Sequence, residues 1–130
     1  MNRAIELHDS KLTAASQIGS SARLSFARVY VHESAGRPGV DAGSGWYQPA
    51  SFLITSAGLM SSVQLPSLLA DGVLRAGDDT HTNLIPAERL VQGPIELSLT
   101  LSTGETLSVC GDTLSIELHG QPSVVESFTP

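Results

Sequence analysis

Residues 94–120, PIELSLTLSTGETLSVCGDTLSIELHG, alternate between apolar and polar side chains almost residue by residue. Ile95, Leu97 and Leu99 fall on one side of an extended chain, and the intervening Glu and Ser residues fall on the other. A period of two is typical of a β-strand with one buried face. The STGE turn and Gly111-Asp112 each suit a hairpin. We therefore expect a three-stranded antiparallel meander.

The segment ARLSFARVYVHES, residues 22–34, predicts another long strand, but its apolar residues change side midway. Leu24 and Phe26 share one face, whereas Val29 and Val31 share the other. A β-bulge near Ala27-Arg28 would turn all four inward. Without a bulge, Tyr30 and His32 would lie on the face of Leu24 and Phe26.

Other segments extend the β pattern over the whole chain. Residues 3–8 and 50–60 are β-rich, and SVVESF (123–128) is typical of a final edge strand. Asp71-Gly72 predicts a hairpin. IPAERLV (85–91) favours one short helical turn, because proline suits the first position of a helix. With turn signals recurring regularly, we expect one all-β domain over residues 1–130, an antiparallel sandwich or flattened barrel of roughly eight or nine short strands.

Composition excludes several classes of function. The net charge is −6 and the chain holds a single lysine, Lys11. Neutralisation of nucleic-acid phosphates or attraction to an anionic membrane is therefore not expected. Cys110 is the only cysteine, so no intrachain disulfide forms, which suits a reducing compartment. The first residues lack the apolar stretch of a signal peptide, and the sequence predicts a soluble cytoplasmic protein.

The Gly-rich segment ESAGRPGVDAGSGWYQP, residues 33–49, is the main candidate ligand site. Its four glycines accept positive φ, and long loops in compact domains often carry function. Trp46 and Tyr47 would stack on a sugar or another flat ligand, and Asp41 and Gln48 would hydrogen-bond its hydroxyls. The alternative is structural: Trp46 covers one end of the barrel and Asp41 closes a turn.

The histidines and serines lack the sequence motifs typical of metal sites and of nucleophilic catalysis. His8 and His32 are the candidate metal ligands, and with Asp41 they would serve a metal-assisted enzyme, yet no HxH or HxxxH spacing occurs. His8 and Asp9 are adjacent on a strand and should point to opposite faces, so Asp9-Ser10 is better explained as a turn. A GxSxG nucleophile motif is absent, and the serines are too numerous to single one out. No catalytic residue or cofactor is predicted.

Two stretches, IELHDS (5–10) and YVHESAGRPGVDAGSGW (30–46), resemble small uncharacterised bacterial β-domain proteins with a Leu-His-Asp-Ser segment near the N-terminus. The resemblance implies a β-rich fold and brings no activity or cofactor. The HDS start is also similar to that of some toxin-immunity proteins. The expected function is that of a non-enzymatic binding protein with a protein partner or self-association. The alternatives are a small-molecule or carbohydrate binder and a metal-assisted enzyme.

Overall fold

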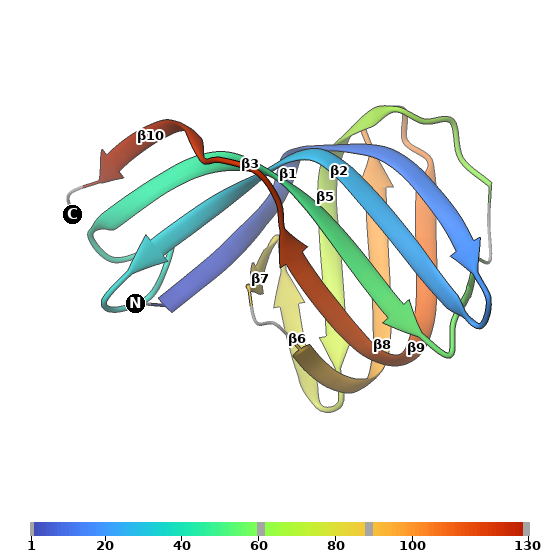
Figure 1. The fold of residues 1–130 in the computed structure, drawn as a ribbon. Helices are drawn as coiled ribbons and strands as arrows, with labels where there is room; N and C mark the ends of the chain where they lie inside the picture. The colour runs from blue at the N-terminus through green and yellow to red at the C-terminus, as the bar shows by residue number, and fades with distance from the viewer. Residues whose placement is uncertain (1, 60–61, 88–89, 129–130) are drawn as a thin grey trace.

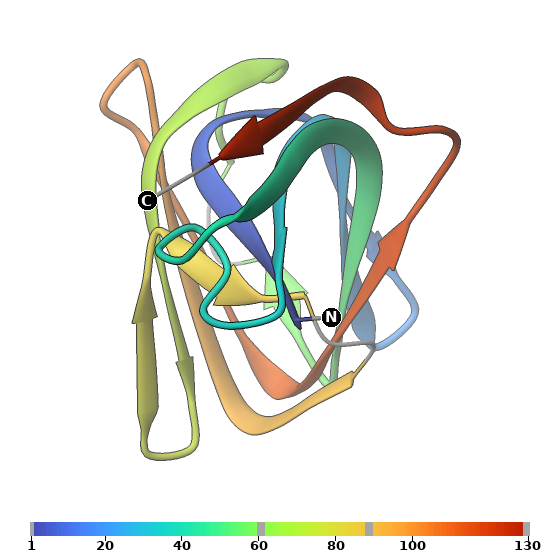
Figure 2. The ribbon, with the colours of Figure 1, turned by 90° about the vertical axis from the view of Figure 1, so that its left-hand side faces the viewer.

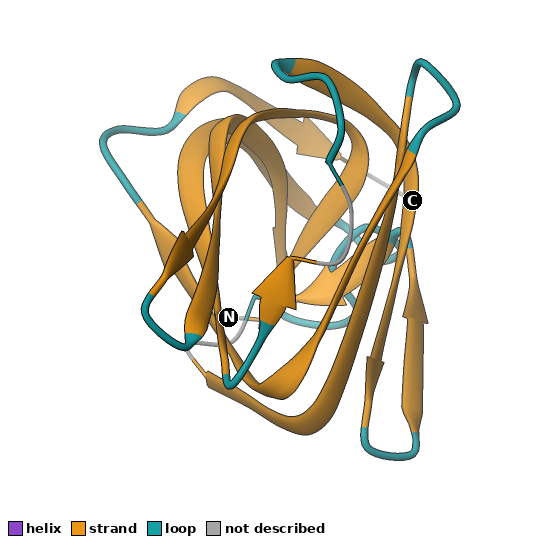
Figure 3. Ribbon diagram, turned by 90° about the vertical axis from the view of Figure 1, so that its right-hand side faces the viewer, coloured by secondary structure: helices purple, strands orange, loops and turns teal. Residues whose placement is uncertain are grey.

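The structure is a computed structural model that describes residues 2–59, 62–87 and 90–128. Within these ranges all regular structure is β, and no helix occurs (Figures 1 and 3). The expected all-β fold is thus confirmed. The strands are β1 (Asn2–Ile18), β2 (Ser21–Ser34), β3 (Gly43–Thr55), β4 (Gly58–Leu59), β5 (Ser67–Ala76), β6 (Asp79–Thr82), β7 (Leu84–Pro86), β8 (Leu90–Leu101), β9 (Thr106–Leu118) and β10 (Ser123–Phe128).

Six long strands form a closed antiparallel barrel, in the order β3-β2-β1-β5-β8-β9. Pairing of β9 with β3, from Ala50–Leu118 to Thr55–Thr113, closes the ring. Strands β4, β6, β7 and β10 add short pairings around it. These barrel strands run to 10–17 residues, longer than the sequence predicts. Closure removes the exposed edges that an open sheet would leave.

One end of three barrel strands continues beyond the ring as a projecting sheet, which we call the lip (Figures 1 and 2). The lip comprises residues 2–6 of β1, 29–34 of β2 and 43–48 of β3, together with β10, which pairs with the start of β3. Register shifts separate the lip from the barrel in both β1 and β2. The lip therefore has its own two faces.

The predicted bulge in β2 is confirmed. Phe26 aligns with Ala50, and the next aligned pair is Val29–Gln48, so Ala27 and Arg28 together face a single residue of β3. The bulge brings Leu24, Phe26, Val29 and Val31 into the core together. Tyr30 and His32 consequently occupy the opposite face of the lip.

Two predicted hairpins are wrong. Asp71-Gly72 lies inside β5, and Gly111-Asp112 lies inside β9. Both glycines serve close packing instead of a turn: a Cβ on Gly72 would lie 2.5 Å from Leu7, and one on Gly111 would meet the carbonyl oxygen of Thr55. Glycine inside a strand often marks such an approach. The meander is therefore two long strands, β8 and β9.

The Gly-rich loop is shorter than predicted. Residues 35–42 connect β2 to β3, and the remainder of residues 33–49 is strand. Only Gly39 of its four glycines has a positive φ, 80°. The predicted helical turn is also not observed where the structure describes it, because Ile85 and Pro86 lie in β7, while residues 88–89 lie outside the described residues. No helix in the described ranges has the length and apolar character needed to span a membrane.

Candidate functional site

The four predicted ligand residues do not form one surface. Trp46 and Gln48 point into the protein, where Trp46 is 7% exposed and belongs to the core. The Trp46 indole donates to Gln48 Oε1 at 2.9 Å, and Gln48 Nε2 donates to the carbonyl oxygen of Gly120 at 3.1 Å. The two side chains therefore satisfy one another and tie the lip to the segment before β10.

Asp41 and Tyr47 have different surroundings. Asp41 Oδ2 accepts a hydrogen bond of 2.6 Å from the backbone N–H of Arg37 and lies 3.6 Å from its guanidinium. Asp41 therefore closes the turn around Gly39, as the structural alternative predicts. Tyr47 lies on the face of β3 opposite Trp46, because adjacent residues of a strand point in opposite directions. It is the one member of the predicted set that lines a pocket described below.

That pocket, of about 300 Å³, lies on the lip face that carries Tyr30 and His32. Pairing of Glu6 with Tyr30, of Tyr30 with Tyr47 and of Gly45 with Glu126 sets its floor across four strands. We call it the acidic pocket. Its lining residues are Glu6, His8, Asp9, Tyr30, His32, Tyr47 and Glu126.

An irregularity in β1 brings His8 and Asp9 to the same place. Asp9 has a φ of 65°, which breaks the alternation of the strand, and His8 Nδ1 lies 3.3 Å from Asp9 Oδ2. The prediction that these side chains diverge is therefore wrong. Two hydrogen bonds hold this irregularity of β1 in place. Asn83 Oδ1 accepts from the His8 N–H at 2.8 Å, and the Ser10 hydroxyl donates to the Glu6 carbonyl at 2.9 Å.

Glu6 and His32 form the most buried polar contact of the pocket. His32 Nε2 lies 3.2 Å from Glu6 Oε1, and the His32 side chain is only 11% exposed. The Tyr30 ring packs edge-on against both His32 and Tyr47, with centroid separations of 4.9 Å each. These contacts fix the two tyrosine rings next to the carboxylates.

Tyr30 has an unusual electrostatic environment. Its hydroxyl is inaccessible to solvent and lies near the Glu126 carboxylate without reaching full hydrogen-bonding geometry. Burial, followed by the negative charge of Glu126, raises its pKa from 10.0 to about 12. Both effects disfavour the phenolate. Tyr30 therefore acts as a neutral aromatic wall at physiological pH.

The pocket presents negative charge and aromatic surface without a cation in its lining. Three carboxylates belong to it, those of Glu6, Asp9 and Glu126, and none of its lining residues is Lys or Arg. Arg28 lies beside the pocket, with its guanidinium carbon 5.2 Å from the Tyr47 ring centre. Carboxylates and tyrosine faces both attract organic cations.

On the other face of the lip, an arginine of the protein itself contacts both a carboxylate and an aromatic ring. Arg3 lies over the Trp46 ring at 5.4 Å, and its Nε donates to Glu33 at 2.6 Å. The Arg3 guanidinium therefore has a carboxylate and an aromatic ring as partners. In the acidic pocket Arg28 lies over the Tyr47 ring, but no arginine lines the pocket beside the carboxylates of Glu6, Asp9 and Glu126.

The predicted metal ligands His8 and His32 line the same pocket. However, the described part of the chain contains no group of three or more His, Cys, Asp or Glu side chains arranged to hold a metal ion. Metal binding by His8 and His32 therefore stays a prediction, and Asp41 does not join them in the pocket.

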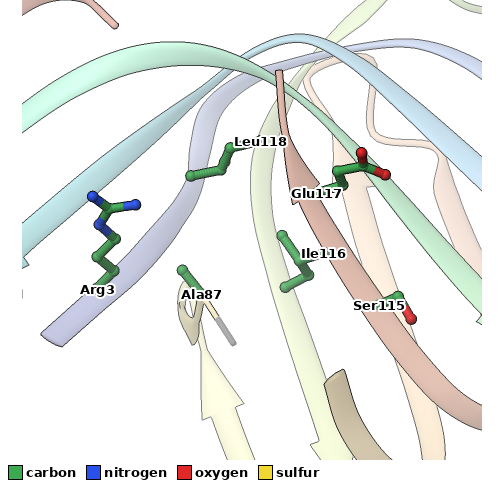
Figure 4. Close-up of a pocket in the computed structure, with 6 residues that line it drawn as sticks. All are labelled: Arg3, Ala87, Ser115, Ile116, Glu117 and Leu118. Atoms are coloured by element: carbon green, nitrogen blue, oxygen red, sulfur yellow. The ribbon is translucent and has the colours of Figure 1, made fainter. Parts of the chain in front are cut away.

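A second pocket, of about 490 Å³, lies between the start of β1 and the end of β9. Figure 4 shows Arg3 on one side, Ile116 and Leu118 on the other, and Ala87 between them. Its cation, Arg3, is already paired with Glu33. Besides Arg3, its polar lining residues are Ser115 and Glu117.

Sequence reasoning missed Glu6, Tyr30 and Glu126. Only the bulge alternative for residues 22–34, which turns Tyr30 and His32 away from the core, contained a signal for them. Glu126 reaches the pocket through a pairing across 81 residues, Glu126 with Gly45, that no local pattern predicts. No protein-family model, curated protein or solved structure matches this chain.

Proposed function

We propose that this protein is an interaction protein whose acidic pocket receives an arginine or lysine side chain of a protein partner. The observation that carries the proposal is the convergence of three carboxylates and two tyrosine rings on one pocket whose lining contains no lysine or arginine. The net charge of −6 adds long-range attraction for a basic partner. A toxin-neutralising protein would be one form of this function.

The pocket favours a side chain over a large ligand. Its volume of about 300 Å³ is at the lower end of the range for small-molecule sites. A guanidinium can donate to several carboxylate oxygens while its plane rests on an aromatic ring. Ammonium shares the charge but lacks the flat, forked donor geometry, so arginine should bind more tightly than lysine.

The direct test is an NMR titration with N-acetyl-arginine amide, which presents the side chain as a peptide would. Its neutral isostere, N-acetyl-citrulline amide, is the control ligand. Amide signals of residues 6–9, 30–32, 47 and 126 should shift with the arginine compound only. No difference between the two compounds would contradict a cation site.

Variants locate the site. Glu6→Gln and Glu126→Gln should each weaken binding about five-fold, the effect of losing one partly exposed ion pair. Glu105→Gln removes the same charge from the β8–β9 turn, outside the pocket lining, and should bind like the wild type. Equal weakening by all three would indicate attraction to net charge alone.

A further titration distinguishes a protein partner from a free amine. Agmatine carries the guanidinium without any peptide group. If agmatine binds far more tightly than N-acetyl-arginine amide, the small-molecule alternative replaces the protein-partner proposal. Comparable affinities support recognition of a side chain within a polypeptide.

A further inference from the structure

A serine and a histidine form a close pair on the outer face of the barrel, in a cluster that shares no residue with the acidic pocket. Ser51 Oγ lies 2.7 Å from His119 Nε2. Pairing of β3 with β9, together with the hydrogen bond from the His119 N–H to the Pro49 carbonyl, brings them together across 68 residues. The structure thus singles out one serine among many.

A cation and a pocket lie beside this pair. Arg23 Nη2 donates to Ser51 Oγ at 3.3 Å. A pocket of about 320 Å³ adjoins the serine, with the apolar side chains of Ile18 and Leu53 in its wall. The remaining lining residues are Arg23, Ser51, Ser115 and Glu117.

Glu117 is the acidic residue in the lining of this pocket. It lies directly opposite Ser51 in the β3–β9 register and two residues before His119 in the chain. The pocket beside Ser51 therefore carries one cation, Arg23, and one carboxylate, Glu117.

We propose that Ser51 is a nucleophile activated by His119, and that it accepts the acyl group of esters with a short apolar acyl chain. A serine and a base within hydrogen-bonding distance are the recognised arrangement for nucleophilic catalysis. The acyl chain would lie against Leu53 and Ile18. The guanidinium of Arg23 would stabilise the negative charge that develops on the carbonyl oxygen.

The reaction balances with water as the only co-reactant. Ser51 Oγ forms a bond to the acyl carbon while its proton passes to His119 Nε2. The ester C–O bond then breaks, and the leaving alcohol takes that proton. Water attacks the acyl-serine with His119 again as base, which releases the carboxylic acid and restores the serine hydroxyl. This activity is independent of the interaction proposed above.

The experiment is covalent labelling with a fluorophosphonate probe, followed by intact mass and peptide mapping. We expect one label per chain, on Ser51, and none on the Ser51→Ala variant. His119→Gln should slow labelling about 100-fold, the contribution of a positioned general base. Ser25→Ala is the matched control, since Ser25 is paired directly with Ser51 on β2 and should label like the wild type.

Substrate preference provides a second readout. Wild-type protein should hydrolyse p-nitrophenyl butyrate faster than the acetate, and Leu53→Ser should lose that preference while still labelling at Ser51. Thermal melting of each variant shows that it remains folded. Labelling at another residue, or an unchanged labelling rate in His119→Gln, would overturn the proposal.

Discussion

Tyr30 illustrates how a single residue can be well packed and yet poorly satisfied. Its ring contacts His32 and Tyr47, but its hydroxyl is buried and has no hydrogen bond of good geometry to any residue in the described ranges, with the Glu126 carboxylate as a nearby acceptor. An unsatisfied buried hydroxyl opposes folding. The ring therefore stabilises the lip, and the oxygen atom does not.

Replacing Tyr30 with Phe should therefore not destabilise the protein at neutral pH. We expect a free energy of unfolding between unchanged and about 1 kcal/mol higher, because the ring packing is kept and the desolvation cost is removed. Urea denaturation at pH 7 measures this. A loss of more than about 1 kcal/mol would mean that the hydroxyl has a partner in solution.

The same hydroxyl should give the protein a stability loss at high pH. Tyr30 has a pKa of about 12 when folded, against 10.0 normally. Below pH 10 the tyrosine is protonated in both states, and its contribution is complete. As the pH rises from 10 towards 12, only the unfolded chain releases the proton, so the free energy of unfolding falls. Denaturation curves from pH 9 to 11.5 should show a steeper fall for wild type than for Tyr30→Phe.

The sequence indicated which residues could belong to a site, but it did not indicate which residues lie next to them in the fold. His8 and His32 were identified, and the structure places both in one pocket. Their meeting depends on the φ of 65° at Asp9, which no local pattern requires of an aspartate. Ser51 could not be distinguished from other serines, because its histidine comes from another strand.

At the scale of elements, glycines inside strands decide where the barrel can pack closely. Gly72 and Gly111 both follow or precede an aspartate, which is why they predict turns. The bulge at Ala27-Arg28 was predictable, because the apolar pattern itself changes side there. The close packing at Gly72 and Gly111 was not predictable, because it depends on atoms of the neighbouring strands.

Substitution of Gly111 by Ala should destabilise the barrel by about 3 kcal/mol, because the added methyl meets a backbone carbonyl that cannot move aside. Gly58→Ala is the control on the paired strand β4. Its added methyl has no neighbour within 4 Å, so the change should be within about 1 kcal/mol and stabilising if anything. Chemical denaturation of both variants tests the difference, and equal effects would count against the close approach at Gly111.

At the scale of the whole molecule, β3 belongs to both the lip and the barrel. Its first half pairs with β10 in the lip, and its second half pairs with β9 to close the barrel. The described side chains of β10 are exposed, including Val124 at 65% and Val125 at 64%. Strand β10 therefore contributes to the lip and the acidic pocket, whereas the barrel is closed without it.

Truncation after Gln121 should impair the acidic pocket and leave the barrel folded. We expect the shortened chain to unfold cooperatively, since the ring of six strands and the Gln48–Gly120 hydrogen bond remain. Binding of N-acetyl-arginine amide should weaken, because Glu126 is lost from the pocket. Circular dichroism melting and the NMR titration check these outcomes, and loss of all cooperative unfolding would show that β10 is needed for the barrel.

The closure of the ring also bears on how the chain reaches its native state. Ala50 pairs with Leu118, and Ile5 with Ile85, so the contacts that complete the structure join residues far apart in the sequence. Such topologies fold slowly, typically in milliseconds to seconds, because the entropy of closing long segments opposes the first contacts. The hairpin of β8 and β9 is local and can form early. Until β9 meets β3, both carry unpaired edges, and that interval is when the chain is most exposed to aggregation.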